Sequence, residues 1–388
     1  GQHEIPHHDI RRIFTRDGET FWLGSLGGGL IRFNYTDKTF TQWANTPNAD
    51  YPFATNDVWG VFDDSRGPIW IGTDSAGLWR IDPKTEKVDG FIHDATVKNS
   101  LASDKARMIF EDRDNNIWIG GFSGIIDYYN RDLEHFLRYK QRNRFHNGVT
   151  HPSILAIEPS LTPELSGYWV GTEGGLDLIV PHKGAVKSFT PDNSALNAGP
   201  VLALKATSAD TLWVGTWGGG LSRFNPITNT WHHFINQPAG AKQLTAPYIW
   251  AIETDDLGRV WVGSQKEGVF RVDPNTLTVE HFPYNTTVDG SSQGNRKGIA
   301  GEFIRDILKD SKGDIWISSL QGLTHYSAES DHFTIHHHRA DNPNSLASNQ
   351  LISLLEHSDG KIWIGSRDKG LSIFDPSNQT YPRLGLAD

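Results

Sequence analysis

The sequence predicts an all-β protein, a β-propeller built most simply from eight four-stranded blades. A tryptophan flanked by aliphatic or aromatic residues, and followed in most copies by glycine, recurs at intervals of roughly 44 to 55 residues. Short β-favouring runs alternate with turn clusters in every copy, and no segment has a helical period. The tryptophan of each repeat is expected on the second strand of its blade, strand B, as a core residue between blades. The repeats are centred on Trp22, Trp70, Trp118, Trp169, Trp213, Trp261, Trp316 and Trp363.

The last repeat justifies the four strands, called A to D, in order. Ser-Asp-Gly ending at Gly360 predicts the A–B hairpin, because glycine adopts a positive φ without strain. Pro376 ends strand C, because proline cannot donate to a sheet ladder. The strands expected in this repeat are A at 349–356, B at 361–366, C at 371–374 and a short D that begins at 379–381 and ends near 384.

Every repeat is complete, which favours eight blades in a single domain spanning residues 1–388. The alternative is seven blades plus one extra repeat, which would leave the two faces of that repeat unpacked. Complete repeats also mean that the first blade must pack against the last. Only residues 2–6 are then available as an extra strand, so we expect this seam to be the weak point of the fold.

Composition excludes several classes of function. A net charge of −10 and an isoelectric point near 5.9 provide no basic field, so we expect no nucleic-acid partner and no direct membrane contact. The absence of cysteine excludes disulfides, thiolate metal sites and cysteine nucleophiles. The chain begins at Gly1 without an apolar signal region, which is expected of an excised or processed segment.

Several motifs resemble the two-component regulator propeller repeat. They are the Ile-Trp-Ile-Gly-Thr of residues 69–73 with the Gly-Leu-Trp-Arg-Ile-Asp-Pro of 77–83, the equivalent runs 212–216 and 219–226, and the linker 342–346. The resemblance implies an extracytoplasmic sensor segment, periplasmic or extracellular, of a bacterial membrane-bound regulator. It also implies a possible homodimer formed through the parent receptor.

Strand order places the B–C turns and the D–A connections at one end of the blades, and these are the segments where the copies differ. Variable loops on a rigid scaffold are the usual place for binding. Two B–C turns carry large aromatic residues, Phe122 and Trp217. Such a residue could stack on a sugar ring, and it could equally pack over a neighbouring blade.

The starts of the A strands are expected to line a central channel. Guanidinium and indole groups together suit acidic or neutral oligosaccharides. The alternative is that the arginines pair with Glu111, Asp306 or Glu302 to fill a solvated channel. Alignment places eight residues at one equivalent position: Arg11, Trp59, Arg107, Ile154, Leu202, Trp250, Arg305 and Ile352.

Histidines are abundant in two D-strand regions, but the pattern favours no metal. Neighbouring residues on a strand point to opposite faces, so only His336 and His338 could share an ion, and no carboxylate stands at a matching offset. We expect no metal, no cofactor and no catalytic residue. The predicted ligand-binding residues are Arg11, Trp59, Arg107, Trp217, Trp250 and Arg305.

Three functions remain open. The first is a non-catalytic sensor that recognises an oligosaccharide or a similar polar ligand. The second is a polysaccharide lyase or related lyase, in which Arg107 or Arg305 would act beside His8 or His151. The third is a module that docks another protein.

Overall fold

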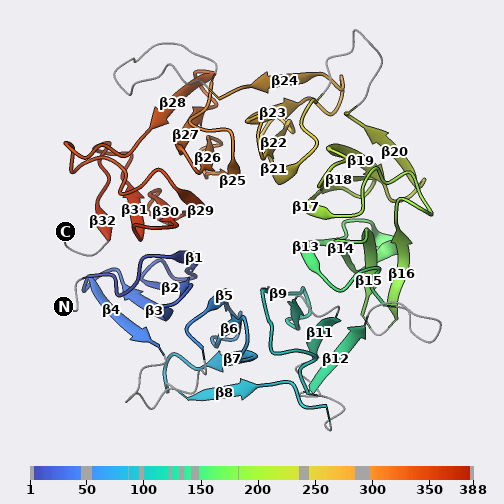
Figure 1. Cartoon of the computed structure of the whole chain (residues 1–388), viewed down its shortest axis with the longest axis horizontal. Coiled ribbons are helices and arrows are strands. Elements are labelled where there is room, and N and C mark those ends of the chain that lie inside the picture. The colour runs from blue at the N-terminus through green and yellow to red at the C-terminus, as the bar shows by residue number, and fades with distance from the viewer. Residues whose placement is uncertain are drawn as a thin grey trace. The chain divides into compact units, whose positions relative to one another are not determined.

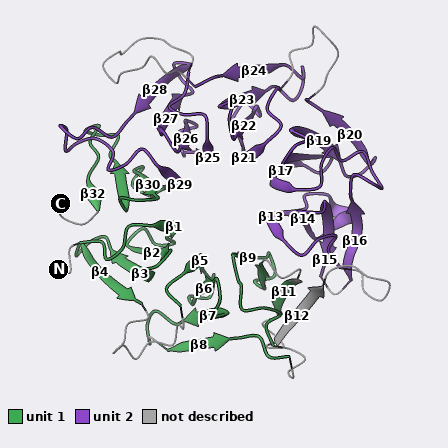
Figure 2. Ribbon diagram, in the orientation of Figure 1, with its two compact units in different colours: residues 1–140, 355–388 green, residues 141–354 purple. Residues whose placement is uncertain are grey.

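The computed structural model of the chain consists of four-stranded antiparallel sheets (Figure 1). Contacts divide it into two compact units, which are described separately (Figure 2): unit 1, residues 1–140 and 355–388, and unit 2, residues 141–354. The structure describes residues 4–44, 55–85, 87–95, 100–121, 125–130, 135–140, 148–181, 183–235, 244–284 and 298–384.

Unit 1 holds the first three sheets and most of the last. The strands are β1 (Ile10–Phe14), β2 (Thr20–Ser25), β3 (Gly29–Asn34) and β4 (Thr39–Trp43) in the first sheet, and β5 (Val58–Asp63), β6 (Ile69–Thr73), β7 (Leu78–Ile81) and β8 (Val88–Phe91) in the second. The third has β9 (Met108–Glu111), β10 (Ile117–Gly120), β11 (Ile125–Asn130) and β12 (His135–Lys140), and the last has β29 (Leu351–Glu356), which crosses the unit boundary, β30 (Ile362–Ser366), β31 (Leu371–Phe374) and β32 (Arg383–Leu384).

Unit 2 holds the four sheets between them. The strands are β13 (Ile154–Pro159), β14 (Tyr168–Thr172), β15 (Leu176–Val180) and β16 (Gly184–Phe189), then β17 (Val201–Ser208), β18 (Thr211–Thr216), β19 (Leu221–Asn225) and β20 (Thr230–His233). They continue with β21 (Ile249–Thr254), β22 (Val260–Ser264), β23 (Val269–Val272) and β24 (Val279–Phe282), and β25 (Ile304–Lys309), β26 (Ile315–Ser319), β27 (Gly322–Ser327) and β28 (His332–His336).

The predicted fold class is confirmed: the chain is all-β, with the eight four-stranded blades of an eight-bladed β-propeller, so the seven-blade alternative is wrong. In each sheet the strands lie in chain order. The one helical element in the described part of the chain is the 3-10 turn η1 (Pro163–Leu165). The hairpin glycine Gly360 has a φ of 78°, as the turn prediction requires. Strand D of the last blade lies later than residues 379–381, because Gln379 occupies the turn with a φ of 55°.

The repeating tryptophans on strand B are core residues, as predicted. All eight are at most 2% exposed. In four blades the aspartate six residues earlier accepts a hydrogen bond from the indole Nε1 at 2.8 or 2.9 Å, while its carboxylate also binds N–H groups of the A–B turn. One carboxylate thereby links the hairpin to the core. The four pairs are Asp64 with Trp70, Asp112 with Trp118, Asp255 with Trp261, and Asp310 with Trp316.

The first and last blades pack against each other within unit 1. Residues 4–9 form no extra strand; instead Ile5 is fully buried in the shared core. The His8 carbonyl accepts a hydrogen bond from Gly370 N of the last B–C turn at 3.0 Å. An equivalent hydrogen bond joins the first blade to the second, where Gly29 N donates to Asn56 O at 2.8 Å. The contact at the seam therefore repeats a contact made between successive blades.

Ile5 also occupies the place that the D–A loops fill elsewhere. It lies five residues before the first buried residue of strand A, Ile10. Six later repeats have a buried aliphatic residue at the same offset, so the N-terminal segment acts as the D–A loop of the last blade. These residues are Leu101, Val149, Leu196, Leu244, Ile299 and Leu346.

Candidate functional site

Four of the five predicted site residues at the starts of the A strands lie at β-bulges. In β1 the pairing with β2 shifts between Ile10 and Arg12, so Arg11 is the extra residue. The same shift leaves Trp59, Trp250 and Arg305 as extra residues in β5, β21 and β25. A bulge removes one residue from the regular ladder and turns its side chain out of the alternation.

One aligned position was wrong by a residue. Ile154 pairs with Thr172 and is 1% exposed, which makes it the counterpart of the buried Ile10. Leu155 is the bulge residue of this blade. The error arises because a bulge adds a residue without changing the apolar pattern around it.

Three of the predicted residues meet in unit 1, in a group called the unit 1 cluster: Arg11, Trp59 and Arg107. The guanidinium carbon of Arg107 lies 4.5 Å from the centroid of the Trp59 ring, and that of Arg11 lies 5.6 Å from it. Arg11 is held by Asp9, with Nε 2.6 Å from Oδ1 and an Nη2–Oδ2 bond of 2.7 Å. The cluster therefore combines two cations with one indole that both of them engage.

Two of the carboxylates considered as partners of the arginines, Glu111 and Asp306, accept hydrogen bonds from backbone N–H groups. Glu111 accepts a hydrogen bond from Ser65 N at 2.9 Å, and Asp306 accepts one from Leu354 N at 2.9 Å. The carboxylate that pairs with Arg11 is Asp9, two residues away in sequence, which the alignment of repeats did not consider.

The other three predicted residues meet in unit 2, joined by Tyr248; this group is called the unit 2 cluster: Trp217, Tyr248, Trp250 and Arg305. The guanidinium carbon of Arg305 lies 4.8 Å from the Trp250 centroid. Trp217 meets Trp250 edge to face, with centroids 5.9 Å apart and planes at 87°. Its centroid is 4.5 Å from that of Tyr248. Tyr248 was missed, because it precedes the strand and only the tertiary contact with Trp217 brings it to the site.

The turns around both clusters confirm locally that B–C turns meet D–A connections. Leu26 in the first B–C turn forms a bridge with Asp57, and Trp217 forms the equivalent bridge with Tyr248. Trp217 N donates to Pro200 O, and Gly218 N donates to Pro247 O, both at 2.8 Å. The backbone of Trp217 is thus held by Pro200 and by Tyr248, yet the residue remains 39% exposed. Phe122, the other predicted aromatic turn residue, lies outside the described residues.

The two histidines considered for lyase chemistry lie in different units. His151 Nδ1 is 3.6 Å from Glu173 Oε2 and accepts a hydrogen bond from Ser153 N at 3.2 Å. His8 is placed through its carbonyl, which binds Ile10 N and Gly370 N. The two clusters bring together guanidinium donors and aromatic rings.

The histidines considered for metal binding make protein contacts. His336 is buried and its ring lies 6.3 Å from that of Trp316; burial, with the nearby His325 and His337, lowers its pKa to about 3. His338 Nδ1 is 2.7 Å from Leu346 O. Within the described ranges, no three histidine or carboxylate residues are grouped as metal ligands.

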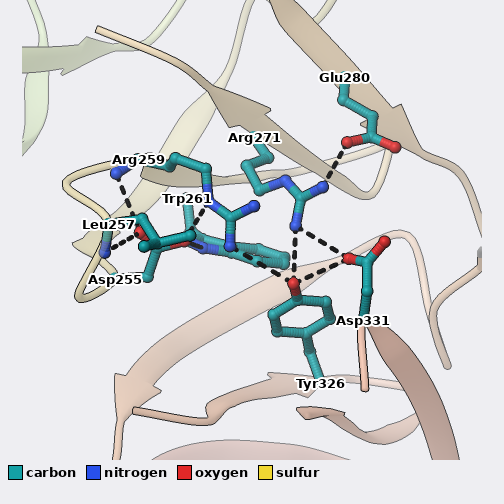
Figure 3. Close-up of polar contacts among 8 residues, drawn as sticks. All are labelled: Asp255, Leu257, Arg259, Trp261, Arg271, Glu280, Tyr326 and Asp331. Atoms are coloured by element: carbon teal, nitrogen blue, oxygen red, sulfur yellow. Dashed lines mark hydrogen bonds and ion pairs between the residues drawn. The ribbon is translucent and has the colours of Figure 1, made fainter. Parts of the chain in front are cut away.

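A cavity of about 380 Å³ lies against the network in Figure 3, lined by Arg259, Arg271, Asp273, Thr278, Val279 and Glu280. Arg271 donates to Glu280 at 2.6 Å and to Tyr326 Oη at 2.9 Å, which joins the sixth blade to the seventh. Grooves at the matching positions of the first and fifth blades are lined by Arg32 and Arg223. A hollow lined by this strand C arginine therefore recurs in several repeats, and in the sixth blade the arginine also joins two blades.

Comparison with known proteins supports the resemblance predicted from the motifs. Residues 100–123, 298–321 and 345–368 match the family described as two component regulator propeller, and each match contains the A and B strands of one repeat. No curated protein matches the sequence. Among the described residues, no helix is long and apolar enough to cross a bilayer.

Solved structures share the fold at low identity. The extracellular domain of a putative hybrid two component system from B. thetaiotaomicron has a TM-score of 0.60 and 17% identity, covering 99% of this chain and 54% of that one. A computationally designed protein, Ika8, has a TM-score of 0.63, 12% identity and coverage of 96% and 99%. Virginiamycin B lyase from Staphylococcus aureus has a TM-score of 0.52, 16% identity and coverage of 81% and 94%. This chain thus spans about half the length of the first of them.

Proposed function

We propose that this chain is a non-catalytic sensor propeller of a bacterial signal-transduction protein, exposed to the periplasm or the exterior. It recognises an oligosaccharide or a similar polar ligand at the end of the blades that carries the B–C turns and D–A loops. The ligand-binding residues are Arg11, Trp59, Arg107, Trp217, Trp250 and Arg305.

The observation that carries this proposal is the pairing of guanidinium with indole in both units. Residues from separate repeats meet as Arg107 over Trp59 in unit 1 and as Arg305 over Trp250 in unit 2. A guanidinium over an aromatic ring is attracted by the ring quadrupole, and guanidinium N–H groups are good donors to hydroxyls and carboxylates. Hydrogen-bond donors beside aromatic rings are the usual lining of a polar-ligand site.

Two further findings support the signalling role. Three repeats match the two component regulator propeller, and the fold matches the extracellular domain of a putative hybrid two component system. Attachment to a membrane-bound parent, and a homodimer formed through it, follow from the same proposal. The fold is also shared with a lyase, which keeps lyase activity as an outcome to be tested.

The test is a thermal-shift screen of the purified chain against a panel of neutral and acidic oligosaccharides. A ligand that binds only the folded state at 100 times its Kd stabilises the protein by about 2.7 kcal/mol. We expect at least one glycan to raise Tm, and Arg107→Ala and Arg305→Ala to remove that shift. Arg66→Ala, an exposed arginine of an A–B turn, is the matched control and should keep it.

Three outcomes would contradict the proposal. No stabilisation by any glycan would remove the ligand class, and full affinity in both arginine variants would remove the site. Unsaturated products absorbing in the ultraviolet would establish a lyase instead of a sensor.

A further inference from the structure

The three tryptophans of the proposed site differ in how their ring faces are used. The Trp59 ring is engaged by the guanidinium groups of Arg11 and Arg107, and the Trp250 ring by that of Arg305. A sugar that stacked on the same face as one of these guanidinium groups would compete with that cation. Trp217 contacts the rings of Tyr248 and Trp250, no guanidinium or ammonium of the described residues lies over its ring, and it is 39% exposed.

The Trp217 ring is also held in place. Its backbone is bonded to Pro200 O and bridged to Tyr248. Its side chain contacts the Tyr248 ring at 45° and the Trp250 ring at 87°, so protein packs against it from two directions. An exposed ring that is already ordered loses little conformational entropy when a ligand covers it.

We infer that Trp217 is a stacking platform for the flat face of an uncharged hexopyranose ring, and this inference rests on the proposed function. The face of an indole carries the negative part of the ring quadrupole, which attracts the positively polarised C–H groups on one side of a pyranose. The same face repels a carboxylate or sulfate. The Arg305 guanidinium, stacked on Trp250 beside the platform, donates to hydroxyl groups of the sugar.

The experiment uses five hexasaccharides: β-1,4-linked glucose, mannose and galactose, β-1,4-linked xylose, and the acidic α-1,4-linked galacturonate. Affinity is measured by calorimetry for the wild type, Trp217→Ala and Trp217→Phe. We expect a neutral hexose oligosaccharide to bind best, Trp217→Ala to weaken it about tenfold, and Trp217→Phe to restore part of the loss. Tyr284→Ala, which removes another exposed aromatic residue, is the control and should leave affinity unchanged.

A second readout separates stacking from a general loss of structure. Protons on the stacked face of the sugar should shift upfield in the NMR spectrum with the wild type and with Trp217→Phe, and this shift should disappear with Trp217→Ala. The unliganded Tm of each variant shows whether it is folded.

The outcomes distinguish this inference from the proposed function. Unchanged affinity in Trp217→Ala, with weakened binding in Arg107→Ala and Arg305→Ala, would overturn the platform and leave the sensor site standing. Binding of galacturonate or xylose alone would overturn the assignment to an uncharged hexose. Binding of none of the five would overturn the assignment to an uncharged hexose, while a Tm shift with another glycan of the wider panel would leave the sensor site standing.

Discussion

Phe21 of the first blade and Trp363 of the last blade stack face to face, with ring centroids 3.7 Å apart and planes inclined by 10°. Both rings are fully buried. Around them His357 Nε2 lies 2.5 Å from Gly18 O, and Lys361 Nζ donates to Tyr35 Oη at 2.7 Å. The seam expected to be the weak point thus has an aromatic core and a polar border; its strength relative to other blade contacts stays a prediction.

Truncating the stacked pair should weaken the seam strongly. Phe21→Ala leaves a cavity against Trp363 and should lower the free energy of unfolding by roughly 3–5 kcal/mol. Urea unfolding followed by circular dichroism measures the change. Phe21→Leu should cost less, and a Phe21→Ala midpoint equal to that of the wild type would show that the seam does not limit stability.

The N-terminal segment should contribute as much as a D–A loop. Ile5 is fully buried, so Ile5→Ala should cost roughly 2–4 kcal/mol in the same assay. Ile92 is 57% exposed, and Ile92→Ala should change stability by less than about 0.5 kcal/mol. Equal effects of the two substitutions would refute the role assigned to Ile5.

Arg271 should be needed at the junction of the sixth and seventh blades. It is 8% exposed, bonded to Glu280 and Tyr326, and lies over the Trp261 ring at 5.3 Å (Figure 3). Arg271→Met keeps the apolar stem but removes these bonds, and should cost roughly 2–3 kcal/mol. Arg271→Lys should be intermediate, because an ammonium cannot reproduce the planar fork. Thermal unfolding measures both; Lys312→Ala, at an exposed position, is the control.

Asp63 should make stability depend on pH. Burial raises its pKa to about 6, the carboxylates of Asp17, Asp64 and Glu111 add to this, and Arg16 opposes it. Because the folded state holds the proton more tightly, this group stabilises the fold below about pH 4, and the contribution is lost as the pH rises through 6.

Asp63→Asn removes this charge, so it should raise Tm relative to the wild type at pH 7.5 and change it little near pH 4. The measurement is Tm at both pH values, with the exposed Asp37→Asn as control. The same difference at both pH values would count against the raised pKa.

Local patterns were sufficient for most of the architecture. Trp363 and Gly360 identified strand B and its hairpin, and both occupy those places in the structure. The predicted strand positions were less accurate where the chain departs from the regular hydrogen-bond ladder of the sheet. Ile154 was aligned one residue early because a bulge is invisible in an apolar pattern, and the start of strand D of the last blade was placed too early because Gln379 lies in the turn.

The six site residues were selected as departures from the repeat, and the structure brings all six into two clusters. The different surroundings of the three tryptophan rings could not be predicted from the sequence. Trp59, Trp217 and Trp250 are equivalent as residue types, but guanidinium groups engage two of the rings and the third remains 39% exposed. Tyr248 joined the site only through a contact across two blades.

The sequence by itself determined the number of blades, the strands and the burial of the repeating tryptophans, because these depend on local turn chemistry and on an apolar period repeated along the chain. The tertiary structure decided how the first blade meets the last and which indole rings have a guanidinium over them. Both depend on contacts between side chains from separate repeats, and no single repeat contains those contacts.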